Sequence, residues 1–195
     1  MSGERENCLY HVSPTAGLRE LQPSVTQYFG KPRQVCLTAS LPMALMYGVK
    51  HFEYTYGYTR SGQIYYEEYF PDALAEIYRG KKASLYRCAF RPDMTATAIP
   101  NEYVTPWAVT VLEETPIPDV YEALLEQERL GRLKIVRYSE MTAESLAWVE
   151  AAETETILEH GLLHEDGAFA RYMREKYPRS WEQAQAREKE REAQP

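Results

Sequence analysis

The stretch NCLYHVSP, residues 7–14, places an apolar run directly before a polar turn. Cys8, Leu9 and Tyr10 are typical of a β-strand, and the Ser-Pro pair that follows is typical of a turn. The pattern therefore predicts a strand that ends by delivering His11 into the turn. A single histidine after an apolar run is more often a structural residue than a chemical group. Two later stretches of sequence help to decide whether His11 is a structural residue or a chemical group.

The second stretch, QVCLTASLPMALMYGVK, spans residues 34–50 and predicts a strand, a turn and a helix. The apolar strand ends at Thr38, a short polar connection follows, and Pro42 suits the first turn of a helix. The spacing of the methionines and Tyr47 then gives one helical face. Tyr47 is expected at the edge of the sheet, although simple packing in the core would give the same pattern.

The third stretch, IPNEYVTPW, spans residues 99–107 and holds Glu102 between two prolines. Proline keeps such a segment extended, and a further strand is expected to begin near Trp107. The carboxylate of Glu102 can therefore project from a sheet edge. Taken alone, a glutamate in this setting is usually only solvated.

Composition limits the class of protein. The chain has 195 residues, 44% of them hydrophobic, and a formal net charge of −7. This predicts a globular domain and argues against binding nucleic acid through its phosphates, which needs clustered basic residues. The three cysteines, Cys8, Cys36 and Cys88, lack the spacing of a disulfide or zinc framework. Neither a signal sequence nor a membrane span is expected, so the predicted location is the cytoplasm.

The two halves of the chain differ in texture, which predicts an α+β fold. Residues 7–114 are expected to form a β-rich core, residues 115–180 a helical extension packed on it, and residues 181–195 a charged tail, all within one domain. The strands are expected at residues 9–12, 34–38, 53–58, 63–69, 84–90 and 107–113. Tyrosines alternate along a hairpin around residues 60–62 and suggest a ring-lined sheet face, although ordinary sheet packing would also use them.

Helices dominate the second half. Asp119, Thr142 and Asp166 are expected to cap helices that run to about residues 130, 159 and 177, and residues 133–138 are expected to add a strand. The apolar faces of these helices need burial. The apolar residues on these faces are Val120, Leu124, Leu125, Phe169 and Met173. We expect them to pack on the core and to border the acceptor side of its cleft.

Together the three stretches resemble the ADP-ribosyltransferase superfamily, in the His-Tyr-Glu branch that includes diphtheria-type toxins and poly(ADP-ribose) polymerases. His11 in YHVS matches the histidine of the first strand, and Ser13 matches the hydroxyl residue after it. Tyr47 matches the stacking tyrosine at the end of a helix, eleven residues after Cys36. Glu102 in the run NEYV matches the glutamate that precedes a late strand. The resemblance covers residues 9–114.

The resemblance implies a split β-sheet core that binds NAD as a substrate. Glu102 would bond a ribose hydroxyl and stabilise the positive charge that develops when nicotinamide leaves. Tyr47 would stack on the nicotinamide ring, and His11 would bond a ribose hydroxyl. Backbone groups after the histidine would hold the nicotinamide amide, with Ser13 assisting. Thr38 and Ser40 are further candidates for the pocket wall, and no metal is implied.

Two positions depart from the family pattern. Val12 replaces the usual glycine after the histidine, and its side chain restricts backbone geometry. Cys36 stands where the family often has a tyrosine, which removes one ring from the pocket. The expected activity is transfer of ADP-ribose to an acceptor, which is expected to be a protein.

Other functions fit the same residues. The departures at Val12 and Cys36 are compatible with an inactive binding module of the same fold that recognises a nucleotide or a protein. An RNA 2′-phosphotransferase is disfavoured by the acidic balance. Glu67 and Glu68 form a second carboxylate pair, but strand neighbours point to opposite faces, so we expect them on the acceptor side or in solvent.

Overall fold

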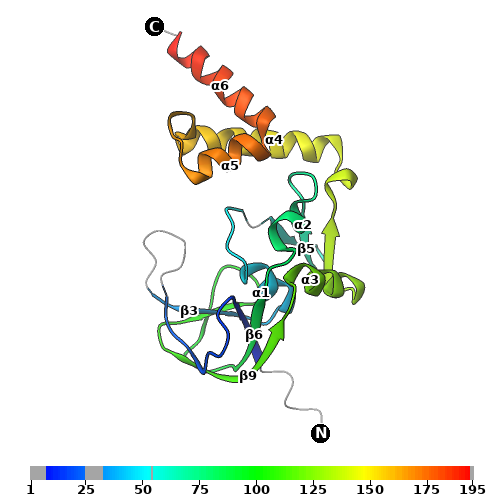
Figure 1. The fold of residues 1–195 in the computed structure, drawn as a ribbon, viewed down its shortest axis with the longest axis vertical. Helices are drawn as coiled ribbons and strands as arrows, with labels where there is room; N and C mark the ends of the chain where they lie inside the picture. The colour runs from blue at the N-terminus through cyan, green and yellow to red at the C-terminus, as the bar shows by residue number, and fades with distance from the viewer. Residues whose placement is uncertain (1–7, 25–32, 54, 194–195) are drawn as a thin grey trace. The chain divides into compact units, whose positions relative to one another are not determined.

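The computed structural model describes residues 8–24, 33–53 and 55–193 (Figure 1). The chain forms two compact units, which we call the core unit and the helical unit. The core unit comprises residues 1–65 and 74–134, and the helical unit comprises residues 66–73 and 135–195. The predicted mixture of strands and helices, an α+β composition, is confirmed.

A seven-stranded antiparallel sheet forms the framework of the core unit, with the strand order β2-β9-β6-β1-β3-β8-β7. Its strands are β1 (Cys8–Ser13), β2 (Glu20–Leu21), β3 (Val35–Thr38), β6 (Ala83–Ala89), β7 (Thr95–Ala96), β8 (Glu102–Thr105) and β9 (Val109–Ile117). The expected strands at residues 9–12, 34–38, 84–90 and 107–113 correspond to four of these. The expected boundary after residue 114 falls inside β9.

One face of this sheet carries a hydrophobic cluster. Leu9 and Cys88 pair directly across β1 and β6, and Leu37 of β3 and Val109 of β9 belong to the same cluster. Paired residues of neighbouring strands present their side chains on the same face, so the strands bury one continuous apolar surface. Tyr86, which pairs with His11, is fully buried in this cluster.

Helix α1 (Leu41–Tyr47) follows β3 directly and packs against β1 and β3. It starts as predicted by Pro42, and Ser40 caps it by accepting a hydrogen bond from the Met43 N–H at 3.4 Å. Such a cap is worth about 1 kcal/mol. Gly48 ends the helix against β1, since an added Cβ there would lie 2.2 Å from Cγ1 of Val12.

Helix α3 (Val120–Arg129) belongs to the core unit, where it packs against α1. Asp119 caps it as predicted by accepting from the Tyr121 N–H at 2.9 Å. Gly131 ends it with φ of +68°, a conformation that favours glycine. Helix α2 (Ala73–Tyr78) comes before β6. A second sheet has the strand order β10-β5-β4, with β4 (Tyr56–Tyr58), β5 (Ile64–Glu67) and β10 (Leu133–Val136).

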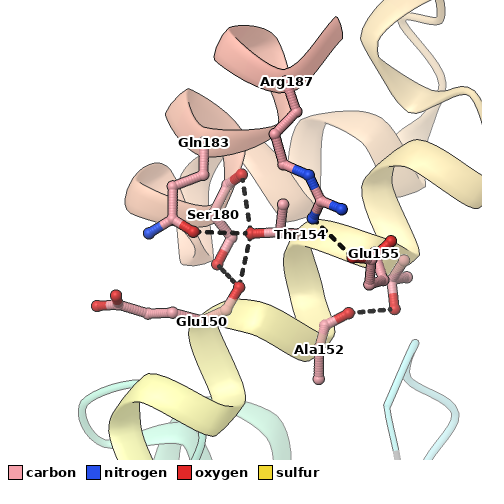
Figure 2. Close-up of polar contacts among 8 residues, drawn as sticks. Glu150, Ala152, Thr154, Glu155, Ser180, Gln183 and Arg187 are labelled. Carbon is pink, nitrogen blue, oxygen red and sulfur yellow. Dashed lines mark hydrogen bonds and ion pairs between the residues drawn. The ribbon is translucent and has the colours of Figure 1, made fainter. Parts of the chain in front are cut away.

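The helical unit contains α4 (Ala143–Glu159), α5 (Ala168–Lys176) and α6 (Pro178–Glu192). Short 3-10 turns lie at Tyr138–Glu140 and Leu162–His164. Figure 2 shows the polar contacts between α4 and α6. The buried Thr154 hydroxyl donates to the Glu150 carbonyl at 2.6 Å, and the Ser180 hydroxyl donates to the same carbonyl at 3.0 Å. At the surface, Arg187 pairs with Glu155 at 2.6 Å.

The segment 66–73 contributes aromatic side chains to the helical unit. Phe70 is buried and meets the rings of Tyr172 and Tyr177 edge to face, with centroids 6.2 and 6.0 Å away. Tyr69 meets Trp148 of α4 in the same manner at 6.0 Å. Phe70 and Tyr177, more than one hundred positions apart in the sequence, are therefore buried together, whereas Trp148 is 60% exposed.

One local expectation for the helical unit is wrong. Asp166 does not cap a helix, because α5 begins at Ala168 with Gly167 as its N-cap. For the charged C-terminal segment a frayed helix and a disordered tail are both expected alternatives, and the segment is helical through Glu192, with Trp181 and Ala184 of α6 buried. Thr142 caps α4 as predicted, and Gly161 has the left-handed conformation expected after its end.

Candidate functional site

The three strands that carry the candidate residues are neighbours in the core sheet, in the order β1-β3-β8. Thr38 of β3 pairs with Tyr10 of β1 on one side and with Glu102 of β8 on the other. The side chains of these paired residues share one sheet face. The fold therefore brings the histidine strand and the glutamate strand within one strand of each other.

His11 lies where β1 and β3 begin to separate. Among the residues described, Tyr10 and Thr38 form the single ladder pair between these two strands. Strand alternation puts Tyr10, rather than His11, on the face of Glu102. The imidazole turns instead toward β3, and its Nδ1 lies 3.0 Å from the Cys36 carbonyl oxygen.

The protonation state of His11 follows from these surroundings. Burial lowers the pKa of the imidazole, while the bond to Cys36 acts in the opposite direction. The ring is therefore neutral at pH 7. A carbonyl oxygen can only accept, so Nδ1 carries the proton, and Nε2 is the acceptor nitrogen of the ring. This tautomer suits a group that accepts a hydrogen bond from a hydroxyl rather than one that titrates.

The residues after His11 are fixed by their neighbours. Val12 is buried against Gly48, so its side chain occupies space between β1 and the end of α1. The Ser13 hydroxyl accepts from the Thr15 N–H at 3.2 Å and begins the turn. The backbone of Val12 and Ser13 pairs with β6 through Leu85 and Ser84.

Glu102 is the first residue of β8 and is partly buried. It follows Asn101, whose φ of +66° lies in the left-handed region that non-glycine residues rarely adopt. Its Oε2 accepts a hydrogen bond of 2.6 Å from the Thr97 hydroxyl. Contrary to the expectation of an exposed sheet edge, β8 lies between β3 and β7. The sequence does not indicate a role for Thr97, because its contact with Glu102 forms only when the turn between β7 and β8 folds.

Tyr47, the last residue of α1, contacts a tyrosine of β4. The hydroxyl groups of Tyr47 and Tyr56 lie 2.5 Å apart, and their rings meet edge to face with centroids separated by 5.8 Å. Tyr56 in turn meets Tyr58 edge to face at 6.4 Å. These three rings form a row that combines one tyrosine of α1 with two of β4, whereas Tyr66 of the other hairpin arm is buried.

Tyr58 connects this row to the segment that carries Glu102. Its hydroxyl donates to the Pro100 carbonyl at 2.8 Å. Burial raises the pKa of the Tyr58 hydroxyl, a hydrogen bond with the Asn101 side chain lowers it, and the negative charge of Glu102 raises it. Tyr58 therefore lies in the field of the Glu102 carboxylate. Nothing in the sequence distinguishes Tyr56 and Tyr58 from the other tyrosines of the hairpin.

The other candidate residues of β3 and its turn have identifiable structural contacts. The Thr38 hydroxyl accepts from the Ser40 N–H at 3.0 Å, and Ser40 caps α1. The sulfur of Cys36 accepts a weak bond from the Gln34 side chain at 3.9 Å. These contacts fix the turn between β3 and α1 and so determine where Tyr47 lies.

Glu67 and Glu68 lie in the helical unit, in a different setting from Glu102. Glu68 is buried rather than solvated, and its Oε2 accepts from the Tyr138 N–H at 3.1 Å. Its own N–H donates to the Val136 carbonyl at 3.0 Å. Glu68 therefore holds the segment after β10.

Two wider searches concern ligands and membranes. In the part of the chain that the structure describes, no three His, Cys, Asp or Glu side chains gather as a metal ion would require. Over residues 8–24, 33–53 and 55–193 we find no helix with the length and apolar character needed to cross a bilayer.

No protein-family profile, curated protein or solved structure matches this chain. The resemblance to ADP-ribosyltransferases therefore depends on the short sequence motifs around His11, Tyr47 and Glu102 alone.

Proposed function

We propose that this chain is an NAD-dependent ADP-ribosyltransferase that cleaves the bond between nicotinamide and ribose. The observation that carries the proposal is the row of rings from Tyr47 to Tyr58, which leads from the candidate stacking residue to the segment holding Glu102. The strands of His11 and Glu102 flank β3, and Tyr10, the neighbour of His11, shares the sheet face of Glu102.

Glu102 is the proposed catalytic residue. When nicotinamide leaves, positive charge develops on the ribose, and a fixed carboxylate beside it lowers the barrier. The Thr97 hydroxyl orients the carboxylate through Oε2. The other oxygen is then directed by that bond and would accept from a ribose hydroxyl. The electron pair of the breaking bond goes to the nicotinamide nitrogen. A nucleophilic atom of the acceptor, or the oxygen of water, then forms the new bond to the ribose carbon.

Tyr47 and His11 are the proposed binding residues. Tyr47 would stack on the cationic nicotinamide ring, a contact worth roughly 0.5–2 kcal/mol. His11 does not share the sheet face of Glu102. Its neutral imidazole, with Nδ1 bound to the Cys36 carbonyl, would therefore accept a hydrogen bond from a ribose hydroxyl at Nε2 at the point where β1 and β3 separate. The backbone at Val12 and Ser13 would hold the nicotinamide amide.

The test is release of nicotinamide from NAD by the purified chain. We expect slow release in water, and Glu102→Gln should reduce it by about a hundredfold or more. Glu113→Gln is the matched control, because Glu113 is an exposed partner of Arg87. Release by the wild type that is no faster than by Glu102→Gln would overturn the proposal.

An inactive NAD-binding module is the second candidate, favoured by the buried side chain of Val12 beside the proposed nicotinamide site. NAD that raises the melting temperature without release of nicotinamide would support it. Loss of this shift in Tyr47→Ala, with the fold retained, would place the binding at the same site.

We propose that the acceptor is a protein. The chain's excess acidic residues lie in the helical unit, whereas acidic and basic residues are nearly balanced in the core unit. The core surface by itself therefore gives no strong charge preference. Cell extract incubated with the chain and labelled NAD should carry label that protease releases. Label released by nuclease instead would identify a nucleic-acid acceptor.

A further inference from the structure

We propose that β4 is a positioning element of the site, in which Tyr58 holds Glu102 and Tyr56 holds Tyr47 in their working geometry. The role in catalysis depends on the proposed NAD cleavage, whereas the positions of the two side chains can be tested without it. Tyr56 and Tyr58 act through other residues and are not themselves proposed to touch the reacting atoms.

A hydrogen bond joins Tyr58 to the turn before Glu102. The hydroxyl donates to the carbonyl of Pro100, two residues before the carboxylate. Between them Asn101 has a left-handed conformation, which asparagine adopts more readily than other non-glycine residues and which is typical of a tight turn. The Asn101 carbonyl also accepts from the Ala39 N–H at 2.9 Å. The turn is thus held from β4 on one side and from the end of β3 on the other.

A hydrogen bond between the hydroxyl groups joins Tyr56 to Tyr47. A hydroxyl separation of 2.5 Å and an edge-to-face ring contact restrict the side-chain torsions of Tyr47. A ring that stacks on a ligand binds better when its orientation is set in advance, since less conformational freedom is lost on binding. Tyr56 therefore acts on affinity, whereas Tyr58 acts on the placement of the carboxylate.

The side chains of β4 alternate between its two faces. Tyr56 and Tyr58 are two residues apart and share one face of the strand, whereas Gly57 points to the other. There an added Cβ would require the ring of Tyr65 to move, because it would lie 2.5 Å from the hydroxyl oxygen of that residue. Close contact with Tyr65 of β5 therefore fixes β4 from behind, and both tyrosines are presented toward α1 and the Glu102 turn.

The Tyr58 hydroxyl has a defined protonation state. Its raised pKa keeps it protonated at neutral pH, so it serves as a hydrogen-bond donor and not as a base. Removing the hydroxyl should leave Glu102 charged but less well placed. A carboxylate misplaced by a fraction of an ångström loses transition-state stabilisation before it loses ground-state binding.

The experiment compares Tyr58→Phe, Tyr56→Phe and the control Tyr121→Phe. Tyr121 lies in α3, where its ring contacts Arg79, a contact that phenylalanine preserves. We expect Tyr58→Phe to lower kcat about tenfold or more with little change in KM, and Tyr56→Phe to raise KM several-fold with little change in kcat. Tyr121→Phe should match the wild type. Equal kinetics in all four proteins would overturn the proposal.

A second measurement is independent of activity. Protein labelled at the tyrosine ring carbon is titrated by NMR, with the Tyr58 signal assigned from Tyr58→Phe. In Glu102→Gln the pKa of Tyr58 should fall, because the nearby negative charge is gone, yet stay above its ordinary value because the ring is still buried. An unchanged Tyr58 titration would overturn the positioning of Glu102 by Tyr58. A wild type that shows the coupling but releases no nicotinamide would overturn the proposed function alone.

Discussion

Val12 and Gly48 are in such close contact that an added Cβ on Gly48 would lie 2.2 Å from Cγ1 of Val12. The contact joins the strand of His11 to the helix that ends in Tyr47. The sequence of β1 and the glycine after α1 therefore depend on each other. A glycine at position 12 would remove the contact.

This dependence predicts a specific pattern of stability. Gly48→Ala should destabilise the fold by roughly 1–3 kcal/mol, because the methyl group cannot enter a packed site without moving the helix or the strand. Val12→Ala in the same chain should recover part of this loss. Denaturant unfolding of the two single variants and the double variant measures the coupling.

Gly167→Ala is the control for this pair, because the nearest atom to an added Cβ there is a flexible carboxylate oxygen 3.9 Å away. It should cost about 0.5–1 kcal/mol, because alanine is disfavoured at the N-cap of α5, and this cost should simply add to that of Val12→Ala. Strictly additive effects of Gly48→Ala and Val12→Ala would contradict the predicted contact.

His51 predicts a pH dependence of stability. Burial lowers its pKa to about 4, and its Nε2 lies 3.0 Å from the hydroxyl of the buried Tyr78. As the pH falls, His51 is therefore protonated near pH 6.5 in the unfolded chain but only near pH 4 in the folded chain. The contribution of His51 is constant above pH 6.5 and is lost as the pH falls from 6.5 to about 4, by about 2–3 kcal/mol.

The measurement is the free energy of unfolding across this pH range for the wild type and for His51→Gln. The variant should lose less stability on acidification, while retaining the part due to His11, whose pKa is also lowered. Parallel curves for the two proteins would show that His51 is not buried as the structure describes.

Tyr86 and Glu114 hold the loop that follows His11. The buried Tyr86 hydroxyl lies 2.7 Å from the Thr15 carbonyl and accepts from the Leu18 N–H at 3.3 Å. Glu114 accepts from the Gly17 N–H at 3.0 Å. Tyr86→Phe should cost about 1–2 kcal/mol, because buried polar groups lose their partner. Amide exchange over residues 15–18 should become faster, more than in Tyr121→Phe.

The same loop should respond to acid. The pKa of Glu114 is lowered, chiefly because the Gly17 N–H donates to the carboxylate. A lowered carboxyl pKa means that this stabilisation is present above about pH 4.5 and is lost as the pH falls below it. In Glu114→Gln the exchange of these amides should depend less on pH. Equal pH dependence in both proteins would exclude the contact.

Phe70 predicts a selective effect on the helical unit. Its ring is buried between Tyr172 and Tyr177, so Phe70→Ala should destabilise this unit by about 3–5 kcal/mol. Exchange of the amides of α4–α6 should then increase more than that of β1 and β6. The control is Leu112→Ala, which removes a side chain that is 56% exposed in β9. Uniform loss of protection across the chain would instead show one cooperative unit.

Local rules predicted much of the fold from the sequence. Caps at Asp119 and Thr142 and left-handed glycines at Gly131 and Gly161 follow from backbone chemistry that depends on a few adjacent residues. The central strand of His11 and the strand and helix that lead to Tyr47 were predicted for the same reason. Their strong apolar patterns needed no distant partner to be recognised.

Long-range packing accounts for what the sequence did not predict. Strand β8 is short and bounded by prolines, and pairing with β3 makes it a strand. The charged segment of α6 is helical because Trp181 and Ala184 are buried in the helical unit. Tyr58 could not be distinguished from its neighbours, since its contact with Pro100 crosses 42 positions of the chain.

The helical unit is assembled from two pieces of chain, residues 66–73 and residues 135–195. During synthesis at about 5–20 residues per second, the first piece leaves the ribosome several seconds or more before the second begins to appear. During that time the ring of Phe70 cannot pack against Tyr172 and Tyr177, because neither has been synthesised. Nascent chains stalled before residue 135 should therefore expose this aromatic segment and bind chaperones that recognise it.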